Sequence, residues 1–431
     1  MSSIIRTLII VIMLFGLTGC YNPKELDDLA YVIAIGVDKG KEQDLSVTFQ
    51  IAIPLNISGE GSSPGKETST LLTVDADSVY GAVSKINSEI SKEVNLSQNK
   101  LVVFSEELAK DGLEGYINPF VSNREIRPTS SVVVSKSSAK DFLSTIAPKL
   151  ETNPARYLDL MLSSHYYSGY SVSSELLNFY WDVQSEYEEP IAILAEINTD
   201  SEEENQKSKV SNSSVSSSGN SENSEGNIKE NSTPIFSGLA AFAGTTMVGE
   251  FTEEEVIPHL ILTSGLQPVN FEVPDINNQE MITTVTLSQP IKPKIEIDVI
   301  NNIPKINIEA NIRAKLVTSG TATDYFNDNN RYKLAKAVED KLTKIVYAYL
   351  DKCSKELNVD IVGFGKLLKP KFLTLSELEE IKWQDIFKNS EFTVKIKIDL
   401  NTSQIVTYTE PIKTSEKIEE KQKTSEDGAT R

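Results

Sequence analysis

The 431-residue sequence contains few of the side chains that usually bind metals or act as nucleophiles. It has 2 cysteines, Cys20 and Cys353, and 2 histidines, His165 and His259. Two cysteines are too few for a disulfide scaffold, and the histidines lack a metal-ligand spacing such as H-E-x-x-H. We therefore expect each histidine to be a surface or half-buried ring. Cys353 lies on the apolar face of a predicted helix, where we expect a small buried hydrophobe.

Motifs of catalysis are also scarce. No phosphate-binding loop of the form G-x-x-x-x-G-K-[ST] occurs, and Gly363-Phe364-Gly365-Lys366 lacks both its first glycine and its Ser or Thr. We interpret that segment as a turn with flexible glycines. Carboxylate pairs such as Glu106 with Glu107, or Glu188 with Glu189, are interpreted as solvated charge in an acidic chain. The sequence nominates no catalytic residue, so we predict no enzymatic activity, no cofactor and no metal site.

Positive charge is in deficit. There are 42 lysines and arginines against 62 aspartates and glutamates, which gives a formal net charge of −20. Such a surface repels nucleic acid and anionic lipid headgroups, and we find no dense cluster of lysine and arginine in the sequence. We therefore exclude nucleic acid as a partner. Any attachment to a membrane should come from lipid chains and not from the charge of the protein.

What the sequence does contain is a short apolar segment near its start. Residues 8–17 follow the basic Arg6 and lead into Leu17-Thr18-Gly19-Cys20. A membrane-spanning helix needs roughly 20 apolar residues, whereas a run of about 10 to 14 is typical of a signal-peptide core. The tripeptide before Cys20 resembles the lipobox of bacterial lipoproteins. We predict a signal peptide over residues 1–19, with an uncleaved transmembrane helix as the alternative.

Cleavage before Cys20 would make this residue the new N-terminus, as an S-diacylglycerol and N-acyl cysteine. Each buried methylene of an acyl chain contributes about 0.8 kcal/mol, so two or more chains anchor a protein durably. The sequence therefore predicts a lipid-anchored protein on the extracytoplasmic side of a membrane.

Residues 20–198 alternate between predicted strands and helices. Strands are expected at 30–37 and 45–53, a helix through Val79, Val83, Ile86, Ile90 and Val94, and short strands at 101–104 and 132–134. Aromatic residues crowd residues 157–187, where we expect core or a domain interface, with a stacking groove for a small ligand as the alternative.

Residues 234–411 show a different pattern. We expect a hairpin at 235–251, a helix that opens with the capping box Thr252 to Glu255, and long strands up to residue 318. Strict alternation over residues 305–318 predicts a sheet with one face in water, in an antiparallel arrangement. A helix is predicted over residues 331–358, and a closing strand from Phe392 to Leu400.

These patterns predict an α+β protein of several domains with mixed and antiparallel sheets, each packed with helices. The predicted boundaries are an N-terminal α/β domain at 20–198, a disordered Ser/Asn/Glu-rich linker or loop at 199–233, a middle domain at 234–300, a C-terminal α+β domain at 301–411 and a disordered charged tail at 412–431.

Four segments carry a more specific signal. They are residues 25–39, which end in Gly36-Val37-Asp38-Lys39; residues 122–128 with Arg124 and Arg127, leading to Ala139-Lys140; residues 236–250, which contain Phe236, Gly238, Phe242 and Val248-Gly249; and residues 360–365, of sequence D-I-V-G-F-G, followed by Trp383. In this order after a lipobox, they resemble the Ger(x)C family, the lipoprotein C subunits of spore germinant receptors. Departures are Tyr21-Asn22 after the cysteine and an unusually long Ser/Asn-rich insert.

The resemblance implies three α+β domains in an elongated arrangement and a lipid anchor on the outer face of the spore's inner membrane. It also implies assembly with two integral membrane subunits, A and B, in a complex that senses small-molecule nutrients, and no enzymatic activity. A solute-binding lipoprotein of a transporter is the alternative, which would need a cleft between two similar α/β lobes. An extracytoplasmic hydrolase is a third hypothesis.

Overall fold

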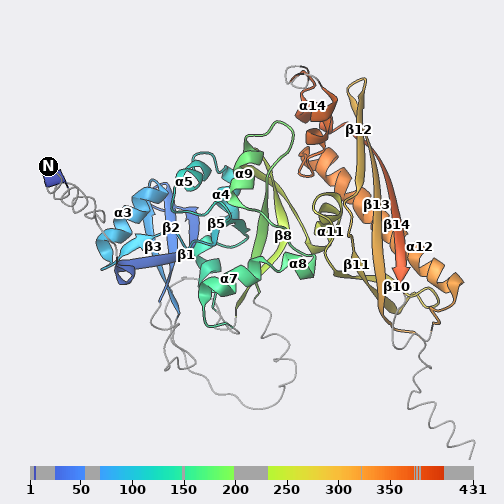
Figure 1. Ribbon diagram of the computed structural model, residues 1–431, viewed down its shortest axis with the longest axis horizontal. Helices are drawn as coiled ribbons and strands as arrows, with labels where there is room; N and C mark the ends of the chain where they lie inside the picture. Colours follow the sequence, from blue (N-terminus) through green and yellow to red (C-terminus); the bar gives the residue numbers. More distant parts are fainter. Residues whose placement is uncertain are drawn as a thin grey trace, which may run out of the picture.

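The computed structural model describes residues 4–5, 25–53, 68–147, 151–198, 232–321, 323–372, 374, 377 and 380–401. Figure 1 shows an elongated molecule with one β-sheet in each half and helix α11 between them. The predicted fold class, α+β with helices packed on mixed and antiparallel sheets, is confirmed. Cys20, nearly all of the predicted linker and the predicted tail lie outside the described residues.

The first half is built on a nine-stranded mixed sheet in the order β3-β2-β1-β5-β6-β7-β8-β9, with β4 paired to β1. Its central strands β1, β5, β6 and β7 run parallel to one another. All five residues of β5 are buried, as a strand covered on both faces requires. The strands are β1 Leu29–Lys39, β2 Leu45–Ala52, β3 Ser69–Ala76, β4 Glu93–Asn95, β5 Leu101–Ser105, β6 Ser131–Ser135, β7 Ile191–Asn198, β8 Thr233–Ala243 and β9 Thr246–Phe251.

Two layers of helices cover this sheet. On one face pack α3 Val79–Glu89, α4 Glu106–Asp111, α5 Ile117–Ser122 and α9 Leu176–Val183; on the other pack α6 Ala139–Ser144, α7 Pro154–Leu162 and α11 Glu253–Leu262. The expected helix through Val94 is wrong at its end, because α3 stops at Glu89 and Val94 lies in β4. Pairing of Val94 with Ala30 in β1 overrides the helical spacing.

The second half is a five-stranded sheet in the order β10-β11-β13-β12, with β14 paired to β13. Along β13 buried and exposed residues alternate, so the predicted wet face is confirmed. The antiparallel expectation is wrong for β14, which runs parallel to β13. The connection between them contains α12 Asp328–Asp351, and this crossover returns the chain in the same direction. The strands are β10 Val269–Pro274, β11 Ile282–Ser288, β12 Lys294–Ile300, β13 Ile303–Ser319 and β14 Glu391–Asn401.

Helix α11 joins the two halves. Its residues from Val256 to Leu262 are all buried, and one continuous hydrophobic core runs from the first sheet through α11 to the second sheet and α12. Of the predicted middle segment 234–300, β8 and β9 belong to the first sheet and β10 to β12 to the second. The division into three domains, with the boundaries given above, stays a prediction.

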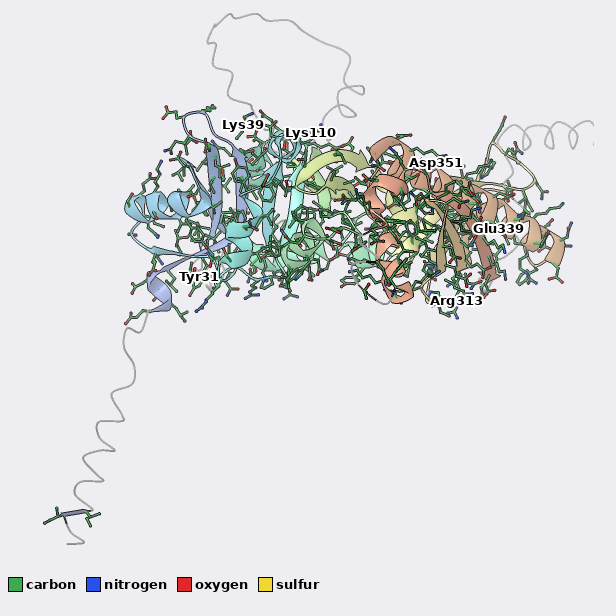
Figure 2. All side chains as sticks on the ribbon, turned by 90° about the horizontal axis from the view of Figure 1, so that it is seen from above. Tyr31, Lys39, Lys110, Arg313, Glu339 and Asp351 are labelled. Carbon is green, nitrogen blue, oxygen red and sulfur yellow. The ribbon has the colours of Figure 1, made fainter. Side chains whose placement is uncertain are left out.

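Charged side chains cover the outside of both halves. Figure 2 shows Lys39 and Lys110 on the first half, and Glu339 and Asp351 on α12 in the second. Within the described part of the chain, no helix combines the length and the apolar character that a bilayer crossing requires.

Candidate functional site at the junction of the two sheets

The predicted lipidation site, Cys20, lies outside the described residues, so its modification stays a prediction. The other cysteine, Cys353, is buried in the helical turn Lys352–Leu357 that follows α12, as expected. Burial raises the pKa of its thiol, which keeps the sulfur protonated and poorly nucleophilic. The described residues therefore offer no activated thiol, and the chemistry of the site has to come from other groups.

A fully buried carboxylate, Asp360, organises the turn after α12. Its Oδ1 accepts a hydrogen bond from the backbone N–H of Gly363 at 2.9 Å, and its Oδ2 accepts from Gly365 N–H at 2.8 Å and Trp383 Nε1 at 2.9 Å. Gly363 has φ +80°, a conformation that favours glycine. The predicted turn at residues 363–366 is wrong beyond Gly363, because the 3-10 helix η3 Phe364–Lys371 begins directly after it. The two glycines serve the carboxylate of Asp360 and not a phosphate.

The glycines also allow close packing. A Cβ on Gly365 would lie 2.7 Å from the ring of Trp383 and from the carbonyl oxygen of Tyr187. Burial is the largest influence on Asp360 and raises the pKa of its carboxyl to about 6, although the donated hydrogen bonds oppose this. We refer to residues 360–366 as the Asp360 turn.

Glu189 connects three segments at this point. Its backbone N–H donates to the carbonyl of Asp360 at 2.9 Å, Oε2 accepts from Gly244 N–H at 2.7 Å and Oε1 accepts from Gln384 Nε2 at 2.7 Å. Its side chain is buried, so the interpretation of Glu188 and Glu189 as solvated charge is wrong for Glu189. Burial raises the pKa of the Glu189 carboxyl.

Lys366 forms two ion pairs at the junction. Its ammonium lies 3.1 Å from Oδ1 of Asp182 in α9 and also contacts the carboxylate of Glu188. Burial raises the pKa of Asp182, while Lys366 lowers it. The pairs link the first sheet's helix layer to the Asp360 turn, 184 residues further along the chain.

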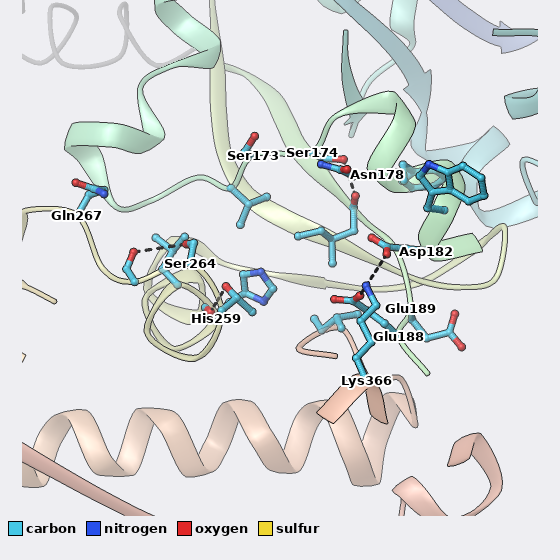
Figure 3. A pocket seen from close by; sticks show the side chains of 18 of the residues that line it. Ser173, Ser174, Asn178, Asp182, Glu188, Glu189, His259, Ser264, Gln267 and Lys366 are labelled. Carbon is cyan, nitrogen blue, oxygen red and sulfur yellow. Dashed lines mark hydrogen bonds and ion pairs between the residues drawn. The ribbon is translucent and has the colours of Figure 1, made fainter. Parts of the chain in front are cut away.

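These groups line a cavity of about 570 Å³ between α9, α11 and the Asp360 turn. Figure 3 shows Asp182, Glu188, Glu189 and Lys366 at one end, and Ser264 and Gln267 at the other. The aromatic cluster of residues 157–187 is divided here. Phe179 and Tyr187 are buried as expected for core, whereas Tyr166 and Trp181 are exposed at the cavity, which matches the alternative of a groove.

His259 of α11 also lines the cavity. Its ring is only 4% exposed, so the expected surface or half-buried position is wrong. The reason is that the part of α11 from Val256 to Leu262 is buried between the two sheets. Nδ1 lies 2.8 Å from the hydroxyl of Tyr349 in α12, and burial lowers the pKa of the imidazole to about 4. The ring is therefore neutral at pH 7. His165 belongs to α8 His165–Ser168.

The segments that carried the family resemblance contact one another or residues that adjoin them in the sequence. Asp38 accepts hydrogen bonds from the backbone N–H groups of Ala139 and Lys140. Phe236 packs edge-on against Phe142 with ring centroids 5.4 Å apart. A Cβ on Gly249 would lie 2.7 Å from Leu357, so the hairpin β8–β9 closely approaches the segment that leads to Asp360.

Two spore germination domains match the chain. Residues 22–197 match the family described as "Spore germination protein N-terminal domain", and residues 237–404 match "Spore germination B3/ GerAC like, C-terminal". The chain belongs to the Ger(x)C family. The two matches meet at the junction described above, because Asp182 and Glu189 lie in the first and Asp360 and Lys366 in the second.

Relatives in Bacillus subtilis (strain 168) agree with this assignment. YfkR is 24% identical over 387 residues, which cover 88% of this chain and 91% of the relative. Spore germination protein KC is 28% identical over 151 residues, 33% of this chain and 37% of the relative. Spore germination protein B3 is 20% identical over 390 residues, 89% of this chain and 94% of the relative. A crystal structure of the GerBC protein aligns with a TM-score of 0.49 at 14% identity, over 88% of this chain and 99% of that one.

Proposed function

We propose that this Ger(x)C protein is the lipid-anchored C subunit of a spore germinant receptor, needed for the nutrient-triggered germination response. The observation that carries the proposal is the match to both spore germination domains, over residues 22–197 and 237–404. The sequence Leu17-Thr18-Gly19-Cys20 supports the anchor, because it resembles a lipobox directly before the first match. The protein acts on the outer face of the spore's inner membrane and has no enzymatic activity of its own.

The subunit works by assembly with the integral membrane A and B subunits. Acyl chains on Cys20 confine the body to the membrane surface on which its partners lie. Confinement raises the effective concentration, so a weak protein interface is occupied without a large contact area. The net charge of −20 keeps the body from binding anionic headgroups directly, which leaves the acyl chains as the membrane contact.

The variant Cys20→Ala tests the anchor. We expect the protein to leave the membrane fraction of spores and the germination response to be lost, while circular dichroism and thermal unfolding stay as in the wild type. Cys353→Ala is the matched control, because it removes the other cysteine and leaves the anchor in place. A released Cys20→Ala protein that supports the full response would contradict the proposal.

Assembly has its own test. After mild detergent extraction of spore membranes, affinity purification of the full chain should recover two integral membrane proteins, which mass spectrometry identifies. Recovery of transporter subunits in their place would favour a solute-binding lipoprotein. From a detergent lysate of whole spores, which retains the released protein, the Cys20→Ala chain should recover the same partners in smaller amount, since it keeps its interface and loses its confinement.

A further inference from the structure

The cavity at the junction carries an excess of negative charge at one end. Asp182, Glu188 and Glu189 line this end, and Lys366 is the cationic side chain that faces them within the described lining. Asp182 and Glu188 both pair with its ammonium group, whereas Glu189 accepts hydrogen bonds from Gly244 and Gln384. Burial raises the pKa of both Asp182 and Glu189, and the nearby charges of Asp360 and Asp182 raise the pKa of Glu189 further.

An apolar wall adjoins this charged end. Trp181, next to Asp182 in α9, is 60% exposed, although Phe179 in the same helix is fully buried. Ile191, Leu260 and Ile361 complete this wall from three different segments. The face of an indole ring attracts a cation in addition to providing apolar area. A wall of this kind beside carboxylates suits a ligand that is cationic at one end and apolar at the other.

His259 places a neutral imidazole ring at the same cavity. Its ring is more than nine-tenths buried, and Nδ1 is occupied by the Tyr349 hydroxyl at 2.8 Å. The residue lines the cavity, so its second ring nitrogen, Nε2, can meet a group bound there (Figure 3). Because the imidazole is neutral, it can either donate or accept a hydrogen bond there.

We propose that this cavity binds a small organic cation, with an ammonium or guanidinium group at Asp182 and Glu188 and an apolar portion against Trp181. Its volume of about 570 Å³ lies in the range of small-molecule sites. A bound cation would relieve the repulsion among the carboxylates, and the neutral His259 would add a hydrogen bond without adding positive charge. The same carboxylates would repel an anionic ligand.

A bare metal ion fits the site less well. Among the described residues, no group of three or more His, Cys, Asp or Glu side chains is placed to hold a metal. The carboxylates are also spread between hydrogen bonds to Gly244 and Gln384 and ion pairs to Lys366, so they do not converge on one point. The inference does not depend on the proposed receptor function, because binding can be measured on the purified chain alone.

Isothermal titration calorimetry of the full chain with three matched probes tests the charge of the ligand. The probes are 2-phenylethylammonium, the neutral 2-phenylethanol and the anion 3-phenylpropionate, which share one ring and differ in their polar group. We expect the cation to bind, the alcohol to bind at least about tenfold more weakly and the anion not to bind. Equal affinity for alcohol and cation, or no binding of the cation, would overturn the proposal.

Two substitutions with opposite expected effects locate the site. Asp182→Asn should weaken binding of 2-phenylethylammonium about tenfold, whereas Lys366→Met should tighten it, because the lysine competes with the ligand for the carboxylates. Glu186→Gln is the control, an exposed carboxylate four residues from Asp182 that does not line the cavity. Thermal unfolding verifies that each variant is folded. If Asp182→Asn and Lys366→Met shift the affinity in the same direction, or if Glu186→Gln weakens it as much as Asp182→Asn, the site is wrong.

Discussion

The carboxylate of Asp38 accepts a hydrogen bond from the backbone N–H of Ala139 at 2.7 Å, although 101 residues separate them. Its second oxygen accepts from Lys140 N–H at 3.0 Å, and Ser138 accepts from Asp141 N–H at 3.0 Å. The first three N–H groups of α6, which have no partner within a helix, are thereby all satisfied. A side chain from the central strand β1 thus caps a helix that packs on the same sheet.

We expect Asp38→Ala to lower the free energy of unfolding by about 1 to 3 kcal/mol, because it removes the acceptor of the partly buried Ala139 N–H and of the exposed Lys140 N–H. Asp38→Asn keeps one acceptor oxygen, so its free energy of unfolding should lie between those of Asp38→Ala and the wild type. Urea unfolding measures all three proteins. Asp44→Ala, at an exposed position in the following turn, is the control. A loss for Asp44→Ala equal to that of Asp38→Ala would mean that the cap contributes nothing specific.

The hairpin β8–β9 offers a second matched comparison between two glycines with positive φ. Gly238 has φ +87°, and a Cβ there would lie 2.5 Å from the backbone oxygen of Phe251. Gly244 has φ +59°, and a Cβ there would meet nothing within 4 Å. The two positions therefore separate backbone strain from steric overlap in one hairpin.

Gly244→Ala should cost about 1 to 2 kcal/mol of unfolding free energy, the price of the left-handed conformation alone. Gly238→Ala should cost about 1 to 3 kcal/mol more, because the backbone of β9 must also shift. Thermal or urea unfolding of the two variants gives the difference directly. Equal losses would show that β9 accommodates the methyl group without strain.

Much of the fold was predictable because local patterns determine it. The alternation along β13 follows from one buried and one wet face, and the predicted capping box of α11 is present, with Thr252 N–H donating to Oε2 of Glu255 at 2.8 Å. The position of strand β14 in the sequence was predicted correctly, but its direction relative to β13 was not. Direction depends on the crossover through α12, which the alternation within the strand does not encode.

The junction could not be predicted, because its residues look ordinary in sequence. Glu107, in the pair Glu106–Glu107 at the start of α4, is exposed, whereas Glu189, in an identical Glu-Glu pair, is buried. Its burial depends on Gly244 and on the Asp360 turn, which are distant in the chain. Likewise, His259 is buried because both sheets enclose α11, and no spacing within the helix signals that enclosure.

Asp360 should give the protein a pH dependence of known sign. Burial raises its carboxyl pKa from 3.8 to about 6, so the folded state holds the proton more tightly than the unfolded state. The stabilising contribution is complete below pH 3.8 and is lost as the pH rises through about 6. The change is about 2 to 3 kcal/mol at most.

The measurement is the difference in unfolding free energy between wild type and Asp360→Asn, which does not titrate, from pH 4 to pH 7. As the pH rises, the unfolding free energy of the wild type should fall relative to that of Asp360→Asn. Asp385→Asn, at an exposed position near Trp383, controls for the loss of a surface charge. If the Asp360→Asn difference is constant over this range, the carboxylate is not perturbed as its burial implies.

His259 should titrate with the opposite sign. Burial lowers its pKa from 6.5 to about 4, so the unfolded state binds the proton first, and the histidine's contribution to stability is lost as the pH falls from 6.5 toward 4. As the pH falls over this range, the unfolding free energy of the wild type should decrease by about 3 kcal/mol relative to that of His259→Gln. Because Asp360 gains stability in part of the same range, the wild-type curve alone conceals both effects, and only the differences from the single variants separate them.

Proton NMR gives an independent measurement, because the chain has only 2 histidines. The spectrum of His259→Gln retains the resonance of His165 alone and so assigns the Cε1 proton of His259 in the wild type. That resonance should stay at the position of a neutral ring from pH 7 down to about pH 5, because protonation would place a charge in the enclosed space between α11 and Tyr349. A His259 resonance that shifts with a midpoint near 6.5 would show that solvent reaches the ring and that the junction is open in solution.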